Sequence, residues 1–157
     1  MASLQDCIKF AKENPICSVA TMDGAQPRTR FLGLWRVDET GFYFQTETKK
    51  AFYEQLKKNP KTELSFPLFN LFKPGGENAE EADLTEIVQM RVTGEVEFLN
   101  DMELNKKCLE DRPFLKGVGI DSPDSPLLSL FRIAKGEILF WRIMDSTKEA
   151  SLPRIKF

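Results

Sequence analysis

Apolar and polar side chains alternate along several short stretches of the chain, most clearly over residues 88–98. The positions there that point one way are apolar, namely Val88, Met90, Val92, Val96 and Phe98, and most positions between them are polar. A period of two residues predicts a β-strand with one buried face. Similar runs, bounded by turn signals, predict six more strands over residues 16–22, 27–37, 42–46, 61–69, 127–134 and 137–144.

Three other segments follow a helical period. Residues 4–13 begin after Ser3, which forms a capping-box pattern with Asp6. Residues 49–58 and 101–111 show similar amphipathic spacing, and a proline follows each of them within two residues. The sequence therefore predicts helices inserted among the strands.

Six to seven strands with inserted helices indicate a mainly β (α+β) fold, an antiparallel barrel that is closed or partly closed. Regular crossover helices are missing from the pattern, which disfavours a doubly wound parallel sheet. The segment 70–83 is rich in Glu and Asp around Pro74-Gly75-Gly76 and predicts an exposed acidic loop. No stretch resembles an interdomain linker, so residues 1–157 are expected to form a single domain.

The absence of histidine narrows the possible chemistry. It excludes Ser-His-Asp and Cys-His hydrolases and disfavours the usual haem and zinc sites, so no metal is predicted and a cofactor is expected to carry any chemistry. The net charge of −2 gives no reason to expect nucleic acid as a partner, and no apolar run is long enough to span a membrane. The scattered Cys7, Cys17 and Cys108 are expected to be reduced and buried, which together with the absence of a secretory signal at the N-terminus predicts a cytoplasmic location.

Positive charge gathers between residues 27 and 61, where eight Lys or Arg face four Asp or Glu. Alternation along the predicted strand 27–37 puts Arg28 and Arg30 on one face and Phe31, Trp35 and Val37 on the other. The next predicted strand is its hairpin partner, which ends at Thr46 just before a helix that starts with Lys49 and Lys50. Free N–H groups at a helix start, hydroxyls of Thr46 and Thr48 and a guanidinium together favour a phosphate group. A solvated basic surface is the alternative, and it is the better interpretation for Lys57, Lys58 and Lys61.

Four motifs occur in order along this region: Pro27-Arg28-Thr29-Arg30-Phe31-Leu32, Gly41-Phe42-Tyr43-Phe44-Gln45-Thr46, Thr48-Lys49-Lys50-Ala51 and Asn59-Pro60-Lys61. Together they resemble the FMN-binding core of the pyridoxamine 5'-phosphate oxidase superfamily, whose fold is a split β-barrel. The resemblance runs from about residue 14 to residue 94.

The resemblance implies a site for FMN in a homodimer. Arg30 and Lys50 would hold the phosphate, supported by Lys49, Thr46 and Thr48 and accompanied by Arg28. The backbone of Phe31, Leu32 and Gly33 would run along the isoalloxazine ring. Gln89 would reach the flavin from the other subunit and Trp141 would lie near it. A position facing water or an interface explains Gln89 equally well, and core packing explains Trp141.

The chain also departs from the family pattern. It lacks the C-terminal Arg-x-His segment that binds substrate in pyridoxamine phosphate oxidases, and Trp35 stands where they carry a lysine. Vitamin oxidation is therefore not expected, and no catalytic residue is identified. Three functions stay open: an FMN-dependent oxidoreductase acting between a nicotinamide or other donor and an unknown small molecule, a non-catalytic FMN-binding or stress-response sensor, and a site for another phosphate ligand such as a deazaflavin or nucleotide.

Overall fold

The computed structural model describes residues 2–69 and 87–157; the predicted acidic loop 70–83 lies outside them. Three α-helices occur in the described part, α1 (Leu4–Glu13), α2 (Ala51–Lys58) and α3 (Met102–Asp111), together with two 3-10 segments, η3 (Pro113–Val118) and η4 (Ile143–Ser151). The described part of the chain also contains the strands β1 (Ile16–Asp23), β2 (Gln26–Gly33), β3 (Arg36–Asp38), β4 (Gly41–Glu47), β5 (Lys61–Phe69), β6 (Ile87–Leu99), β7 (Leu128–Arg142) and β8 (Ile155–Lys156). None of the described helices has both the length and the apolar character needed to cross a membrane.

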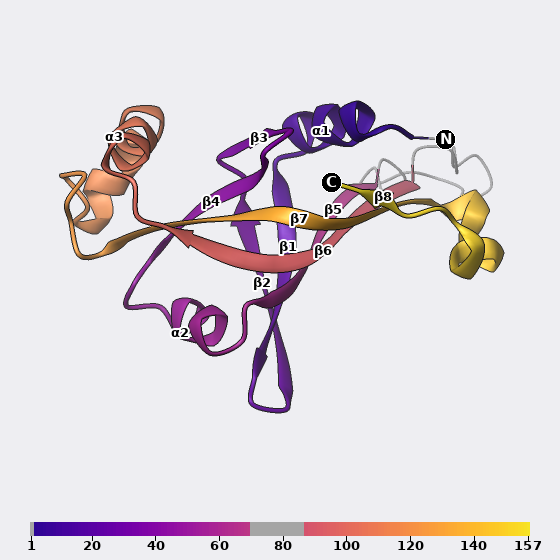
Figure 1. The fold of residues 1–157 in the computed structure, drawn as a ribbon, viewed down its shortest axis with the longest axis horizontal. Coiled ribbons are helices and arrows are strands. Elements are labelled where there is room, and N and C mark those ends of the chain that lie inside the picture. Colours follow the sequence, from indigo (N-terminus) through magenta and orange to yellow (C-terminus); the bar gives the residue numbers. More distant parts are fainter. Residues whose placement is uncertain (1, 70–86) are drawn as a thin grey trace, which may run out of the picture.

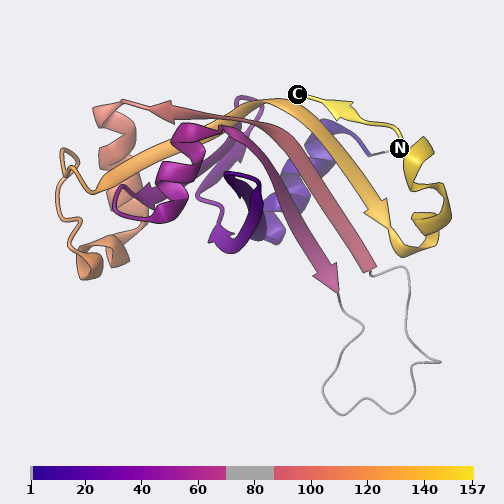
Figure 2. The same ribbon diagram turned by 90° about the horizontal axis from the view of Figure 1, so that it is seen from below.

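The strands form one antiparallel sheet in the order β2-β1-β5-β6-β7-β4-β3, with β8 added to β7. β2 and β3 lie at opposite ends of this order, yet only Leu34 and Trp35 connect them. Because the three Cα–Cα steps from Gly33 to Arg36 span at most about 11 Å, the sheet must curl until its two edges approach each other. The long strands β6 and β7 curve accordingly, as Figure 2 shows. The seam of this barrel is fixed by Leu34, whose N–H donates to the carbonyl of Pro15 at 2.7 Å, and by Trp35, whose N–H donates to the carbonyl of Tyr43 at 3.0 Å.

The predicted fold class, a mainly antiparallel β-barrel with inserted helices, is confirmed, but two strand predictions are wrong. The predicted strand 27–37 is two strands, β2 and β3, because the chain crosses the seam between them. Its predicted pairing was also wrong, since β2 pairs with β1 and only the short β3 pairs with β4. As a result Phe31 and Val37 do not share an environment: Phe31 is 78% exposed, whereas Val37 is buried.

The two predicted C-terminal strands are one continuous strand, β7. The Lys135-Gly136 pair, which resembles a turn in the sequence, instead lies within the strand at a bulge: Gly136 pairs with Gly94, and the register against β6 shifts between Gly94 and Val96. A bulge bends a strand without ending it. Gly136 fits there because it has no side chain: an added Cβ would lie 2.0 Å from the carbonyl oxygen of Thr93.

Gly136→Ala is therefore expected to lower the free energy of unfolding by about 1–3 kcal/mol, as forced overpacking does. Chemical denaturation measures the change. Gly117→Ala is the matched control, because an added Cβ there meets nothing within 4 Å and its effect should stay within about 0.5 kcal/mol. Equal midpoints for Gly136→Ala and the wild type would contradict the close approach of β6 and β7.

The main core lies inside the curled sheet and under α1 and α2. It includes the apolar face of β6 predicted from the alternating pattern, with Met90 and Val92 fully buried. A second cluster around Leu115 and Ile120 packs beneath α3. Cys7, Cys17 and Cys108 are buried as expected, and burial raises the pKa of the Cys17 thiol to about 12. A thiol with that pKa is a packing group rather than a nucleophile at neutral pH.

Candidate functional site

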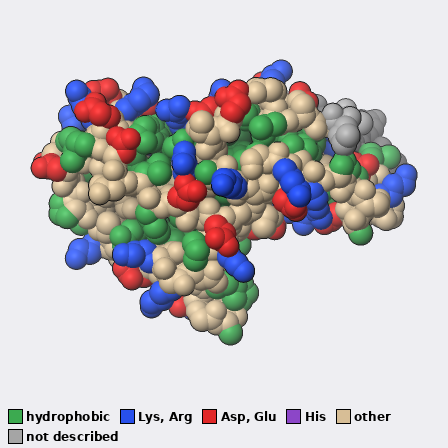
Figure 3. All heavy atoms as spheres, in the orientation of Figure 1, with side chains coloured by type: hydrophobic (Ala, Val, Ile, Leu, Met, Phe, Trp, Pro, Cys, Tyr) green, Lys and Arg blue, Asp and Glu red, His purple; other side chains and the backbone are tan. Residues whose placement is uncertain are grey.

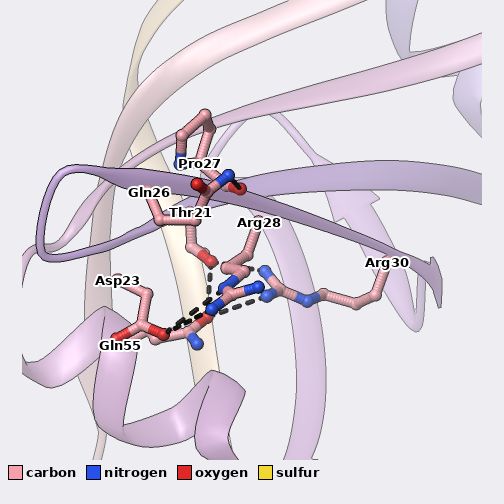
Figure 4. Close-up of polar contacts among 7 residues, drawn as sticks. All are labelled: Thr21, Asp23, Gln26, Pro27, Arg28, Arg30 and Gln55. Atoms are coloured by element: carbon pink, nitrogen blue, oxygen red, sulfur yellow. Dashed lines mark hydrogen bonds and ion pairs between the residues drawn. The ribbon is translucent and has the colours of Figure 1, made fainter.

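Arg30 is the centre of the polar cluster in Figure 4. It lies on β2 opposite Val19 of β1, so its side chain points to the side of the sheet that α2 covers. One terminal nitrogen, Nη1, donates to Thr21 Oγ1 at 2.5 Å, and the other, Nη2, donates to Gln55 Oε1 at 2.8 Å. The Thr21 hydroxyl donates in turn to the same Gln55 oxygen at 2.7 Å. We call Thr21, Gln55 and the Phe52 ring, which lies 4.8 Å from the guanidinium carbon, the Arg30 seat.

The Arg30 seat holds the guanidinium from one side only. Thr21 and Gln55 are both buried, while Arg30 is only half-buried. The contacts within the described residues use Nη1 and one N–H of Nη2, which leaves Nε–H and the second N–H of Nη2. An arginine presents five N–H groups in a planar fork, and two of them on one edge match two oxygens of a phosphate or carboxylate. The Arg30 seat therefore presents a fixed anion-binding edge.

Arg28 adds a second guanidinium on the same side of β2 (Figure 4). It pairs with Asp23 across the β1–β2 turn, with Nη2 to Oδ2 at 3.2 Å, and stays exposed. Burial, followed by the repulsion from Arg28, lowers the pKa of Arg30. A bound anion would offset both effects, because its negative charge favours the charged guanidinium.

The four predicted phosphate ligands around the start of α2 differ in their surroundings. Thr46 is buried, and its hydroxyl has no hydrogen-bond partner among the described residues. The Thr48 hydroxyl donates to the carbonyl of Pro126 at 2.9 Å. Lys50 is the N-cap of α2 and forms an ion pair with Glu47, while Lys49 is exposed. The Thr46 hydroxyl can therefore still form a hydrogen bond with a ligand, while Thr48 and Lys50 already interact with other residues of the chain.

The remaining predicted residues lie elsewhere on the sheet. Gln89 and Trp141 face each other on β6 and β7, as register partners. The Gln89 amide donates to Ser65 Oγ at 2.7 Å, and the buried indole nitrogen of Trp141 has no partner in the described part of the chain. The cross-strand rows put Gln89 on the same face as the exposed Phe31, opposite to the face that carries Arg30. Leu32 packs partly buried against the main core.

The sequence reasoning missed the Arg30 seat itself, Thr21, Phe52 and Gln55. Gln55 carried a usable signal, because it is a polar residue among the apolar positions of an amphipathic helix. A buried polar side chain needs a partner, and Arg30 is a natural one. A cleft of about 600 Å³ adjoins this helix; Gln55 is among its lining residues, which are Met22, Asp23, Gly24, Ala51, Glu54, Gln55, Lys58 and Asn59.

A curled antiparallel sheet whose two edges meet at a seam is the fold of a class of small split-barrel proteins. Residues 4–142 match the family model described as pyridoxamine 5'-phosphate oxidase, and the chain belongs to this family. No curated protein sequence matches the chain.

Solved structures show the same fold. A NimC/NimA family protein from Clostridium acetobutylicum is similar to the chain with a TM-score of 0.69 and 25% identity, over 98% of this chain and 92% of the other. A protein from the same organism related to general stress protein 26 gives 0.60 and 19%, over 98% and 92%. An FAD-binding protein from Mesorhizobium loti gives 0.57 and 18%, over 87% and 90%. The family and the split-barrel fold expected from the sequence are thereby confirmed.

Proposed function

We propose that the protein binds FMN through the Arg30 seat and acts as an oxidoreductase that transfers electrons between a nicotinamide or other donor and a small-molecule acceptor. The observation that carries the proposal is the edge of the Arg30 guanidinium that no described residue contacts, held in place by two buried side chains in a chain of this family. A guanidinium fixed in this way suits the phosphate that distinguishes FMN from riboflavin.

The residues present fit such a ligand. The buried hydroxyl of Thr46 has no partner among the described residues, and a buried polar group without one costs about 1–3 kcal/mol. A phosphate oxygen would satisfy it. Bound flavin supplies the electron-accepting chemistry, and the chain's own part is to grip the phosphate and orient the ring.

We further propose a homodimer, because the predicted ligands lie on both faces of the sheet. Arg30 faces α2, whereas Gln89 and Trp141 occupy the opposite face together with Phe31. A single chain therefore does not present Arg30 and Gln89 to one side. A second copy that offers its outer face would add Gln89 and the indole N–H of Trp141, which has no partner among the described residues, to a shared site.

A non-catalytic role in storing or sensing FMN is the second candidate. The chemistry of the Arg30 seat is consistent with this role. Arginine, threonine and glutamine are its polar groups, and none of them exchanges protons readily near neutral pH. Neither an acid nor a base is supplied there, so turnover would depend on the cofactor and the substrates alone.

Visible spectroscopy of the protein, purified without added cofactor and then titrated with FMN, tests the proposal. We expect the absorbance band in the blue that makes flavoproteins yellow. We also expect the melting temperature to rise when FMN is added. Anaerobic addition of NADH or NADPH then separates the two candidates: bleaching followed by reoxidation with an acceptor supports the oxidoreductase, and bound but unreactive flavin supports storage or sensing. A colourless protein that FMN does not stabilise contradicts both.

A further inference from the structure

A second cavity, of about 460 Å³, opens at the seam of the barrel, away from the Arg30 seat. It lies where the chain crosses from β2 to β3, between the end of α1 and the end of α3. Its lining residues come from these elements and their connections: Lys12, Pro15, Leu34, Trp35, Arg36, Val37, Asp38, Lys107 and Asp111. We call it the seam cavity. Its volume falls in the range of small-molecule sites, about 300–1,000 Å³.

The inner lining of the seam cavity is apolar and fixed. Leu34 is 7% exposed and Val37 is 3% exposed, so both belong to the packed core. The indole of Trp35 is half-buried and held by two contacts: its N–H donates to Asp111 Oδ2 at 3.0 Å, and the Tyr43 ring meets it edge-on with centroids 6.4 Å apart. A rigid indole with its polar atom already satisfied offers its remaining surface to another flat apolar group.

The rim of the seam cavity carries an excess of positive charge, with three cationic side chains against two acidic ones. Arg36 pairs with Asp38, its Nε donating to Oδ2 at 2.7 Å, and Lys107 pairs with Asp111 at 3.7 Å. Lys12 forms no ion pair within the described residues. The space-filling view shows hydrophobic side chains flanked by charged ones on the surface between α1 and α3 (Figure 3).

We propose that the seam cavity binds a small aromatic molecule with one anionic group, such as an aromatic carboxylate. The flat ring stacks on Trp35 over Leu34 and Val37, and the carboxylate lies at the rim next to Lys12. An apolar interior with a few polar groups at its edge is the usual composition of such sites. Neither Arg30 nor Thr46 lines the seam cavity, so this site does not depend on the proposed binding of FMN.

Titration of the ¹⁵N-labelled protein with 2-naphthoate tests the proposal, followed by NMR of the two indole N–H signals. The chain has two tryptophans, and Trp35→Phe assigns the signals. We expect 2-naphthoate to shift the Trp35 signal in a saturable way and leave that of Trp141 in place. The neutral analogue 2-naphthamide should bind at the same place about five-fold more weakly, the effect of one exposed charge pair.

Lys12→Ala should remove this preference for the acid over the amide. Lys57→Ala is the matched control, since it removes the same charge from an exposed position on α2 and should leave both affinities unchanged. An unmoved Trp35 signal, equal affinities for acid and amide in the wild type, or an equal loss in both lysine variants overturns the proposal. Repeating the titration with Arg30→Ala separates the two sites, because 2-naphthoate binding should persist there whether or not FMN binds to the wild type.

Discussion

Replacing Arg30 with alanine is expected to weaken FMN binding by about 100-fold or more. The free edge of the guanidinium offers two charge-assisted hydrogen bonds to the phosphate, and bonds of this kind contribute about 1.5–3 kcal/mol each. The Arg30 seat strengthens the effect, because Thr21 and Gln55 hold the group in place before the ligand arrives. Quenching of flavin fluorescence on titration with the protein measures the dissociation constant.

Riboflavin and Arg28→Ala serve as controls for this result. Riboflavin lacks the phosphate, so its affinity should change little in Arg30→Ala, and the variant should bind FMN and riboflavin almost equally. Arg28 is exposed and already paired with Asp23, so Arg28→Ala should cost less than about ten-fold. If Arg30→Ala still binds FMN tightly, the phosphate does not bind at this site.

Local pattern predicted most of the fold. The strand β6 follows the alternation of apolar positions, and α1 begins at the capping box of Ser3 and Asp6, both of which are present in the structure. The errors arise where tertiary structure overrides local pattern. Residues 27–37 read as one strand because nothing nearby reveals that the barrel seam falls at Leu34 and Trp35, and Lys135-Gly136 resembles a turn because the close approach of Thr93 comes from a distant strand.

The candidate site was predicted in part for the same reason. The sequence pointed to Arg30 as an anion ligand, but the strand pairing expected around it was wrong. β2 pairs with β1 and not with the strand that ends near Thr46. Its actual supports, Thr21 and Gln55, come from elements 9 and 25 residues away in the chain. Hydrophobic periodicity can place each side chain on a face of its own element, but it does not say which faces meet.

Gln55→Glu should weaken FMN binding by about 100-fold while the fold stays intact. Glutamate has the shape of glutamine and keeps an acceptor for both Arg30 and Thr21, but it puts a negative charge 2.8 Å from the guanidinium. At an effective dielectric constant near 20, repulsion between this carboxylate and a phosphate a few ångströms beyond Arg30 amounts to about 3 kcal/mol. Fluorescence titration and thermal unfolding, run on the same samples, report affinity and stability separately.

Two further variants separate the effect of the added negative charge from the effect of losing the hydrogen bonds that hold Arg30. Asn59→Asp adds the same charge at the end of the same helix, where the side chain accepts from the Lys61 N–H, and it should change FMN affinity by less than about three-fold. Gln55→Leu removes the acceptor altogether, which leaves the buried O–H donor of Thr21 and one N–H of Arg30 without their acceptor and should lower the free energy of unfolding by about 1–3 kcal/mol. A stable Gln55→Glu protein that binds FMN as tightly as the wild type would mean that Arg30 does not hold the phosphate from this position. Any anion in contact with one side of that guanidinium is repelled by a carboxylate placed on its other side.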